Sequence, residues 1–238
     1  MFKFVKYRKF TYLQVKFGHN FRALMLMEEK AIKNDVSQRE YPALKIKTRR
    51  LLLRPWRDED LPAFAEMNQD SRVMEFFPAI LDRQQSDSVA MKIRQRINDQ
   101  GWGFWAVEIP GEASFIGFTG LNKLGDDLPF APGVEIGWRL SRDFWGKGYA
   151  SEAALAALEM GFLQLKLREI VAFTAEHNLR SRAVMSRIGL GYAGEKFEHP
   201  GVPPGHSLRT HVLYRIENPF SNAAASEPEL ECQPKNSK

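Results

Sequence analysis

The sequence is poor in cysteine, with Cys232 as the single one among 238 residues. A disulfide within the chain is therefore excluded, and we expect a reducing compartment such as the cytoplasm. A zinc site of the usual cysteine-rich kind is excluded as well. The four histidines between residues 177 and 211 show no metal-ligand spacing. We therefore expect a protein without a bound metal.

Long apolar runs are also missing from the sequence. No stretch approaches the roughly 18 apolar residues that a membrane-spanning helix needs, so we expect no membrane span. Hydrophobic residues make up 44% of the chain and charged residues 26%, both ordinary values for a globular protein. Global disorder and a fibrous repeat are therefore excluded, and the length fits one large domain.

Acidic residues are absent from the first 27 positions, which contain six lysines and arginines. The rest of the chain is close to neutral, so we expect no direct DNA binding, because phosphate binding requires clustered basic side chains. We interpret residues 1–44 as a basic leader and linker, either disordered or peripheral. The spacing of Phe10, Leu13, Phe17 and Phe21 permits an amphipathic helix. Three roles for this leader stay open: an inert extension, a membrane-surface or targeting helix, and a basic arm that contacts RNA or a partner.

Residues 45–220 have the pattern of a mixed α/β (α+β) domain built around one central sheet. Short segments rich in β-branched and aromatic residues predict strands, and apolar residues that recur every three or four positions predict helices. The tail, 221–238, has no packable pattern, and we expect it to be disordered. The expected order is β-α-α-β-β-β-α-β-α-β-β. The strands are expected at 47–56, 103–109, 114–121, 134–140, 168–175, 192–197 and 208–216, and the helices at 58–67, 86–100, 148–165 and 178–188.

The most informative segment is Val134–Glu152, which reads VEIGWRLSRDFWGKGYASE. A predicted strand runs into a loop with Gly146 and Gly148, and a helix follows at once. Glycines let the backbone turn tightly and approach a ligand closely. The unpaired N–H groups and the positive dipole end of the helix attract an anion such as a pyrophosphate, and Lys147 would add a point charge. An ordinary glycine-rich turn between a strand and a helix is the alternative.

Two standard phosphate-binding motifs do not match this loop. A P-loop requires Ser or Thr after its lysine, but Gly148 follows Lys147, and no glycine lies five residues before Gly146. A dinucleotide-binding fingerprint requires a third glycine where this chain has Ser151. The loop therefore matches neither motif.

The segment FWGKGYASEA resembles the acetyl-CoA pyrophosphate loop of the GNAT N-acetyltransferase superfamily. It is most similar to the branch that contains the ribosomal-protein N-terminal (alanine) acetyltransferases. The family pattern is Q/R-x-x-G-x-G/A, and residues 145–150 match it except at the first position, where Trp145 replaces Gln or Arg. The preceding VEIGWRLS resembles the family's fourth strand, and TAEHNLRSRAVMSRIGLGYAGE resembles its fifth strand and next helix. The resemblance extends from about Thr48 to Ile216.

This resemblance implies acetyl-CoA as co-substrate and a sheet in which the strand ending near Leu140 splays from its neighbour near Thr174. The pantetheine arm would pair with the strand edge in that gap, and an amide near the strand end would stabilise the oxyanion. The diphosphate would lie on the amides of residues 146–151. The implied acetyl-CoA contacts are Trp138, Arg139, Leu140, Trp145, Gly146, Lys147, Gly148, Tyr149, Ala150, Ser151, Asn178 and Ser181.

The reaction implied by the resemblance is direct attack of a neutral primary amine on the thioester. A covalent cysteine intermediate does not fit, because Cys232 lies in the tail. Glu135 is the predicted general base, since it lies on the strand that faces the thioester in the family. Glu195 and Glu198 are rival bases, and a structural carboxylate paired with an arginine is the alternative for Glu135.

The acid that protonates the leaving thiolate is harder to predict. Many family members use a tyrosine on the later helix, but residues 178–188 contain none. Ser181 is the predicted acid, because in this branch an N-x-x-S pair lies along pantetheine and the sulfur. The alternative is that Asn178 is an ordinary helix N-cap and that Ser181 is an ordinary residue of the first turn.

We expect Phe77, Glu198 and His199 to line the acceptor pocket, and His211 is a further candidate for the same role. Ordinary packing of these side chains is the alternative. Freeing the amine of a lysine side chain at pH 7 costs roughly 4.6 kcal/mol, and freeing an α-amine costs about 1 kcal/mol. We therefore place a protein N-terminal α-amine first among the acceptors. A small-molecule amine is the alternative acceptor. The alternative function is a non-catalytic acyl-CoA-binding regulatory module. A homodimer is also possible, because dimers are common in such families.

Overall fold

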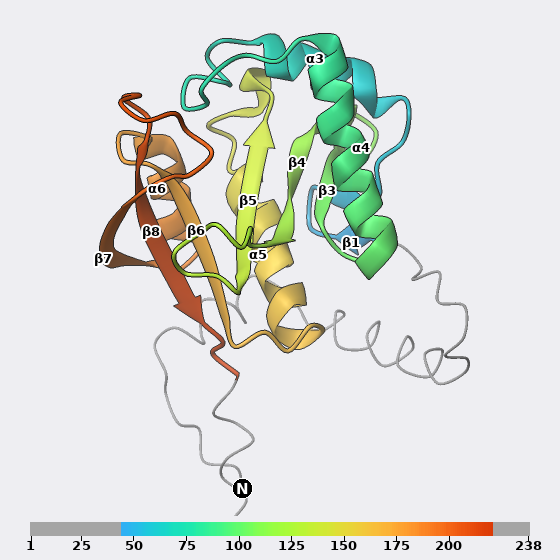
Figure 1. The fold of residues 1–238 in the computed structure, drawn as a ribbon. Coiled ribbons are helices and arrows are strands. Elements are labelled where there is room, and N and C mark those ends of the chain that lie inside the picture. Colours follow the sequence, from blue (N-terminus) through green and yellow to red (C-terminus); the bar gives the residue numbers. More distant parts are fainter. Residues whose placement is uncertain (1–43, 221–238) are drawn as a thin grey trace, which may run out of the picture. The chain divides into compact units, whose positions relative to one another are not determined.

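The computed structural model describes residues 44–220. The predicted leader helix and the predicted disordered tail lie outside these residues. Between 44 and 220, no helix is both long and apolar enough to cross a membrane. The strands form one sheet in the order β1-β2-β3-β4-β5-β6-β8-β7 (Figure 1). They span Ile46–Lys47 (β1), Leu52–Arg54 (β2), Phe104–Ile109 (β3), Ala113–Lys123 (β4), Val134–Leu140 (β5), Glu169–Ala175 (β6), Gly191–Glu198 (β7) and Thr210–Glu217 (β8).

The connections between strands explain this order. Neighbouring strands are antiparallel except for β5 and β6, which run parallel. A parallel pair needs a crossover, because the chain must return to the same end of the sheet before the second strand begins. Helix α5, Tyr149–Leu163, makes that crossover. The predicted mixed α/β fold is confirmed.

The first predicted strand, 47–56, is wrong as a single element. The chain forms two short strands there, β1 and β2, which pair with each other antiparallel. Thr48 causes the turn between them, because its backbone N–H donates to the Leu51 carbonyl at 2.9 Å and its hydroxyl oxygen accepts from the Leu51 N–H at 2.9 Å. This reversal brings Arg50 to the tip of a hairpin.

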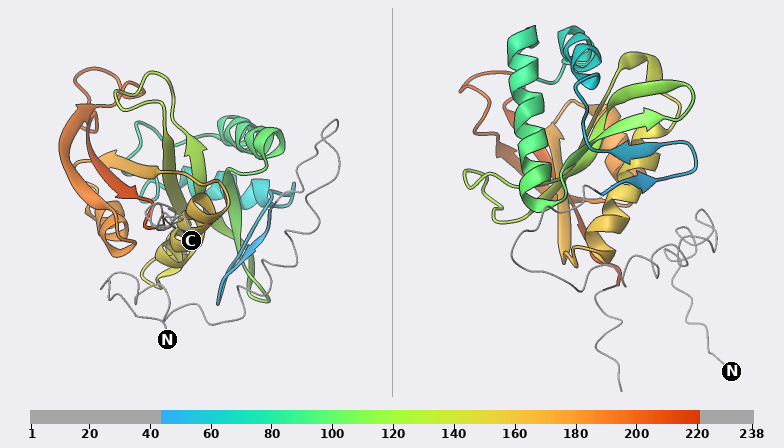
Figure 2. Two further views of the ribbon diagram at one scale, coloured as in Figure 1. Left: turned by 90° about the horizontal axis from the view of Figure 1, so that it is seen from below. Right: turned by 90° about the vertical axis from the view of Figure 1, so that its right-hand side faces the viewer.

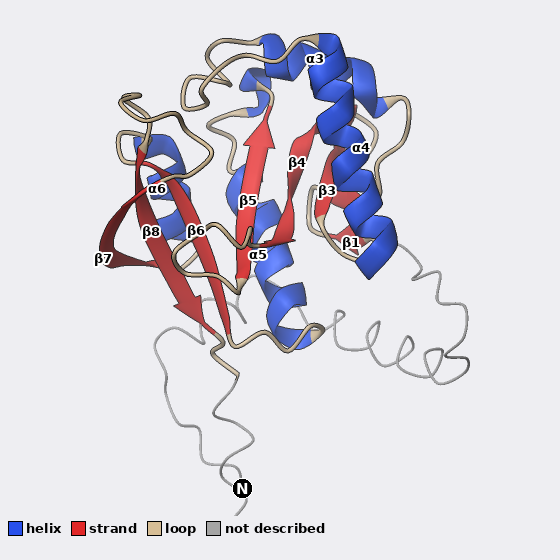
Figure 3. Cartoon of the chain, viewed as in Figure 1, coloured by secondary structure: helices blue, strands red, loops and turns tan. Residues whose placement is uncertain are grey.

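The remaining helices lie on both faces of the sheet. Helices α3, Asp60–Gln69, and α4, Arg83–Gln100, cover one face, and α5 covers the other (Figure 2). Helix α6, Leu179–Arg187, follows β6, and a short 3-10 helix, Arg142–Phe144, follows β5 (Figure 3). The core fills the space between these layers with buried aliphatic and aromatic side chains.

Candidate acetyl-CoA and acceptor site

The centre of the sheet opens between β5 and β6. These strands pair at one register position, Glu135 with Val171, and then diverge (Figure 1). β5 keeps β4 on one side to its end, but on the other side no strand of the described part of the chain pairs with it beyond Glu135. Alternate amides of that edge are therefore available to a ligand. A cavity of about 920 Å³ lies at the opening, which confirms the predicted splayed pair.

The cavity collects most of the residues predicted from the sequence. All of the predicted acetyl-CoA contacts except Lys147 line it, and so do Glu135, Phe77 and His199. Glu198 does not line it. Its carboxylate instead lies 3.0 Å from the Arg209 Nε and accepts a hydrogen bond from the Thr210 hydroxyl at 2.9 Å. The individual roles stay predictions, but β5, the glycine loop and α6 meet around one space.

The glycine loop presents an open anion site at one end of this cavity. Gly146 and Gly148 have φ angles of +74° and +81°, in the left-handed region that favours glycine. A Cβ atom on Gly146 would meet no heavy atom within 4 Å. Gly148 is the N-cap of α5, and no side chain among residues 44–220 caps the helix, so within that range its first-turn N–H groups are open to an anion. The Trp145 indole N–H donates to the Leu140 carbonyl at 2.8 Å and fixes the loop to β5.

Lys147 does not line the cavity, and its role as a point charge stays a prediction. Its Nζ lies 5.4 Å from the centroid of the Phe144 ring, and its carbonyl accepts a hydrogen bond from the Arg50 Nη1 at 2.9 Å. The side chain of Arg50 also lies 4.5 Å from the centroid of the Tyr149 ring. Sequence reasoning missed Arg50, because no local spacing links it to a loop almost 100 positions away.

Two arginines of α6, Arg180 and Arg187, do line the cavity, and sequence reasoning missed both. The guanidinium carbon of Arg180 lies 4.7 Å from the Trp145 ring centroid, and its Nη2 lies 2.5 Å from a carboxylate oxygen of Glu75. Arg187 donates from Nη1 to the Ser151 hydroxyl at 3.2 Å. Their seven-residue spacing puts both on one face of a helix, which is the signal that would have found them.

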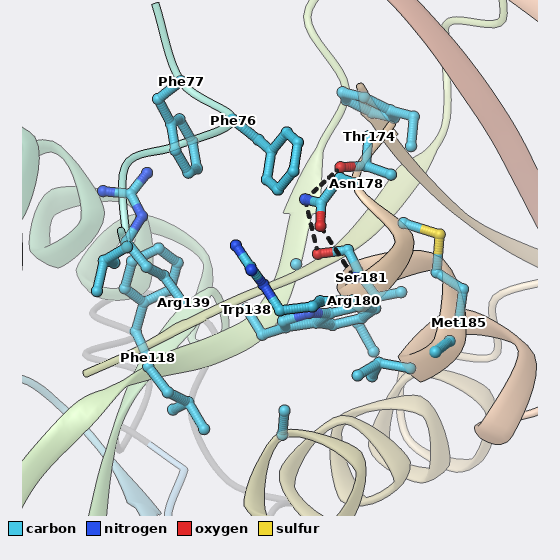
Figure 4. Close-up of a pocket in the computed structure, with 18 of the residues that line it drawn as sticks. Phe76, Phe77, Phe118, Trp138, Arg139, Thr174, Asn178, Arg180, Ser181 and Met185 are labelled. Carbon is cyan, nitrogen blue, oxygen red and sulfur yellow. Dashed lines mark hydrogen bonds between the residues drawn. The ribbon is translucent and has the colours of Figure 1, made fainter. Parts of the chain in front are cut away.

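Asn178 and Ser181 lie side by side where α6 begins (Figure 4). The Asn178 side-chain oxygen accepts from the Ser181 backbone N–H at 3.1 Å, so Asn178 is the N-cap of α6. Its amide nitrogen donates to the Thr174 hydroxyl at 2.9 Å and to the Ser181 hydroxyl at 3.1 Å. The hydroxyl of Ser181 accepts this bond, so its own hydrogen remains to be donated into the cavity. Capping and a catalytic role for Ser181 are therefore compatible.

Glu135 lies at the closed end of the opening, on the face that α3 and α4 cover. Its carboxylate accepts from the Asn122 side chain at 2.7 Å, and Asn122 accepts from the Arg96 Nη1 at 2.6 Å. The predicted alternative of a carboxylate paired directly with an arginine is therefore not what the structure shows. Burial raises the pKa of Glu135, and the Asn122 bond and the Arg96 charge offset only part of that effect. A carboxylate with a raised pKa is a better proton acceptor.

Two histidines border the acceptor side of the cavity. The rings of His199 and His211 lie 4.7 Å apart. Burial lowers the pKa of His211 to about 4 and also lowers the pKa of His199. His211 is therefore neutral near pH 7. Within 44–220 no group of three or more His, Cys, Asp or Glu side chains is arranged to hold a metal ion.

Comparison with known families defines the class of protein. The family model described as "Acetyltransferase (GNAT) domain" matches residues 50–191. This stretch covers more than half of the chain and contains β5, the glycine loop and α6. The chain therefore belongs to the GNAT acetyltransferase family, and it is an acetyl-CoA-dependent N-acetyltransferase.

Particular relatives agree with this assignment. The protein named "Uncharacterized N-acetyltransferase YnaD" from Bacillus subtilis (strain 168) is 32% identical over 171 residues, which are 72% of this chain and 95% of that one. The crystal structure of a GNAT-family acetyltransferase from Bacillus anthracis superposes with a TM-score of 0.62 at 30% identity, covering 74% of this chain and 99% of that one. The ribosomal-protein-S5-alanine acetyltransferase of Vibrio fischeri shares the fold, with a TM-score of 0.58 at 17% identity over 74% and 97% of the two chains.

Proposed function

We propose that the chain transfers the acetyl group of acetyl-CoA to a primary amine by direct attack in the cavity between β5 and β6. The pantetheine arm pairs with the free edge of β5. The diphosphate lies on the amides of the loop at Gly146, where the backbone is open and the helix begins. Arg180 and Arg187 supply positive charge to the same cavity. This open loop beside two cations is the observation that carries the proposal.

The side chains of this chain supply both proton transfers. The amine nitrogen attacks the thioester carbonyl, and Glu135 takes the amine proton through a water molecule. An amide of β5 stabilises the oxyanion. When the carbon–sulfur bond breaks, the Ser181 hydroxyl donates its proton to the thiolate. The proton on Glu135 then passes through solvent to the Ser181 oxygen, so both side chains return to their starting states, and the products are the acetylated amine and CoA.

The proposed acceptor is the α-amine of a protein N-terminus. An α-amine costs less to deprotonate at pH 7 than a lysine side chain, so one buried glutamate suffices as base. Residues 76–78 line the cavity, and its volume of about 920 Å³ has room for the end of a chain. A small-molecule amine is the second candidate, and the size of the cavity accommodates one.

Calorimetric titration with acetyl-CoA tests the donor site. Gly146→Glu places a carboxylate where the diphosphate lies, and we expect binding to be lost. Gly111→Glu is the matched control, because Gly111 also has a φ near +80° and open space around its Cβ position, but lies in the turn between β3 and β4. Equal binding by both variants, or no binding by the folded wild type, contradicts the proposed site.

A further inference from the structure

Arg139 is a cationic side chain on the acceptor side of the cavity. It projects from β5 on the face that α3 covers, and its Nη1 donates to the Asn68 side-chain oxygen at 2.6 Å. Its guanidinium carbon lies 4.0 Å from the Phe77 ring centroid and 5.5 Å from that of Phe118. Figure 4 shows the guanidinium beside the Phe77 ring, away from Asn178 and Ser181. The side chain is therefore held in one place by an amide and two rings.

The charge of Arg139 has no counter-ion within residues 44–220. Burial is the one influence on its pKa, with no contribution from a carboxylate of that range, and its buried Nε has no hydrogen-bond partner there. Burial lowers the pKa of Arg139 to about 10, so it remains charged at neutral pH. Arg54 shows the usual arrangement in the same protein, because its buried guanidinium pairs with Asp60 at 2.8 Å and Glu108 at 2.7 Å. Arg139 is half-buried, and a cation that is partly removed from water without such a partner is costly to the free protein.

The position of Arg139 separates it from the phosphates of the donor. The glycine loop leads into α5, which packs on the opposite face of the sheet. Arg139 and Glu135 project from the same face of β5, because they are an even number of residues apart, and their Cα atoms lie about 13 Å apart along the strand. An acceptor whose amine lies between Glu135 and Arg139 can therefore carry a second group that reaches the guanidinium.

We propose that Arg139 binds a carboxylate of the acceptor, so the substrate is a primary amine that also carries a carboxylate. This inference rests on the proposed function and specifies its acceptor. The planar guanidinium fork matches a carboxylate geometrically, and the Nε without a partner supplies a donor for it. The Phe77 ring lies over the guanidinium, with 4.0 Å between its centroid and the guanidinium carbon, and this cation–π contact holds the fork in place for the carboxylate. The carboxylate belongs either to the first residue of a peptide or to a free amino acid.

Transfer to matched acceptors tests this assignment. The first arm compares peptides that begin with Asp or Asn and with Glu or Gln. The second arm compares free amino acids with their α-amides. Each pair differs in one carboxylate and retains the amine. We expect the carboxylate member to have a kcat/KM about 10- to 100-fold higher in the arm that matches the natural source. Equal values in both arms would overturn the inference and leave the proposed function intact.

Variants of Arg139 connect the preference to this side chain. In Arg139→Gln the carboxylate and amide members of each pair should react about equally, because KM for the carboxylate member rises. Arg139→Lys keeps the charge and should keep part of the preference. The side chain of Arg139 lies against Asn68 and Phe77, so the acetyl-CoA contact implied at this position would be made by its backbone. Acetyl-CoA affinity, measured by calorimetry, should therefore stay within twofold in both variants. A preference that persists in Arg139→Gln contradicts the assignment. If Arg139→Gln does not fold, Arg139→Lys and the wild-type pairs decide. No transfer to any amine, by a protein that binds acetyl-CoA, overturns the proposed function instead.

Discussion

The carboxylate of Glu152 and the guanidinium of Arg50 form an ion pair, with 2.7 Å between Oε2 and Nε. The backbone N–H of Arg50 and the hydroxyl of Thr48 donate to the other oxygen of Glu152, at 2.9 and 2.7 Å. Burial alone would raise the pKa of Glu152, but these bonds lower it. Since Arg50 also binds the Lys147 carbonyl, the β1–β2 hairpin holds both the glycine loop and the first turn of α5.

Arg50→Ala should weaken acetyl-CoA binding without abolishing it. The loop would lose the support that holds it in a binding conformation, but the side chain is partly exposed, so the effect is modest. We expect the dissociation constant to rise about two- to fivefold, which corresponds to about 0.5–1 kcal/mol. Calorimetry measures the change. Arg49→Ala removes the same charge from the exposed neighbouring residue and should bind as the wild type does; an equal loss in both variants would indicate a general charge effect.

Glu135→Gln should abolish most of the turnover while acetyl-CoA still binds. A general base contributes about 10²- to 10⁴-fold to a rate, so kcat should fall at least 100-fold. In the wild type the base must be ionised, so kcat/KM should rise with pH through the raised pKa of Glu135, above its usual value of 4.5. Glu195→Gln and Glu198→Gln are controls, because neither residue lines the cavity. Loss of turnover in one of these controls alone would transfer the role of base to that residue.

The stability of Glu135→Gln provides a second pH dependence. The raised pKa means that the folded chain binds a proton at Glu135 more tightly than the unfolded chain. The free energy of unfolding contributed by this group therefore falls as the pH rises from the usual pKa through the raised one, and is constant above it. The variant should gain stability over the wild type across that same window. Denaturant titrations at several pH values measure the difference, and a pH-independent difference would contradict the raised pKa.

Ser181→Ala should reduce kcat about 10- to 100-fold and leave the affinity for acetyl-CoA nearly unchanged, if its hydroxyl donates the proton to the thiolate. Ser186→Ala is the matched control, because Ser186 is exposed on the same helix. Asn178→Ala separates the structural contribution, since losing the N-cap should cost about 1 kcal/mol of stability. Single-turnover kinetics combined with thermal melts distinguish the two effects. An unchanged kcat in Ser181→Ala would eliminate it as the acid.

Local patterns were enough to predict most of the regular elements. β5 has the bounds that its β-rich run indicates, and α6 begins after Asn178 and ends before Gly189, as its cap residues suggest. The glycine loop was recognisable for the same reason, because the strand, the loop and the helix start lie within one short segment. A site built from adjacent residues leaves its signature in adjacent positions.

Contacts between distant segments could not be predicted in this way. The hairpin at Thr48 combines a backbone bond and a side-chain bond between Thr48 and Leu51, and the pairing of Arg50 with Glu152 joins positions 102 apart. The ion pair of Glu75 with Arg180 and the isolated charge of Arg139 also become visible only when the sheet is assembled. The helix is predicted to begin at residue 58, two positions before α3 begins. Asp60 does lie in the first turn of α3, but its carboxylate binds Arg54.

This pairing of Arg54 and Asp60 leads to a stability prediction. Both side chains are almost fully buried, and two hydrogen bonds of 2.8 Å join the guanidinium to the carboxylate. Asp60→Ala would leave the Arg54 charge with Glu108 alone, and breaking such a buried pair costs about 3–5 kcal/mol. The double variant Arg54→Met with Asp60→Leu should cost less than Asp60→Ala, because Glu108 is partly exposed and keeps the Arg57 Nη1 at 3.5 Å, so no fully buried charge is left without a partner. Denaturant unfolding of the three proteins measures this order. Since α3 leads into the segment with Phe76 and Phe77, we expect the single variant also to raise KM for the amine at temperatures where it is still folded. A single variant more stable than the double would mean that solvent relieves the charge of Arg54.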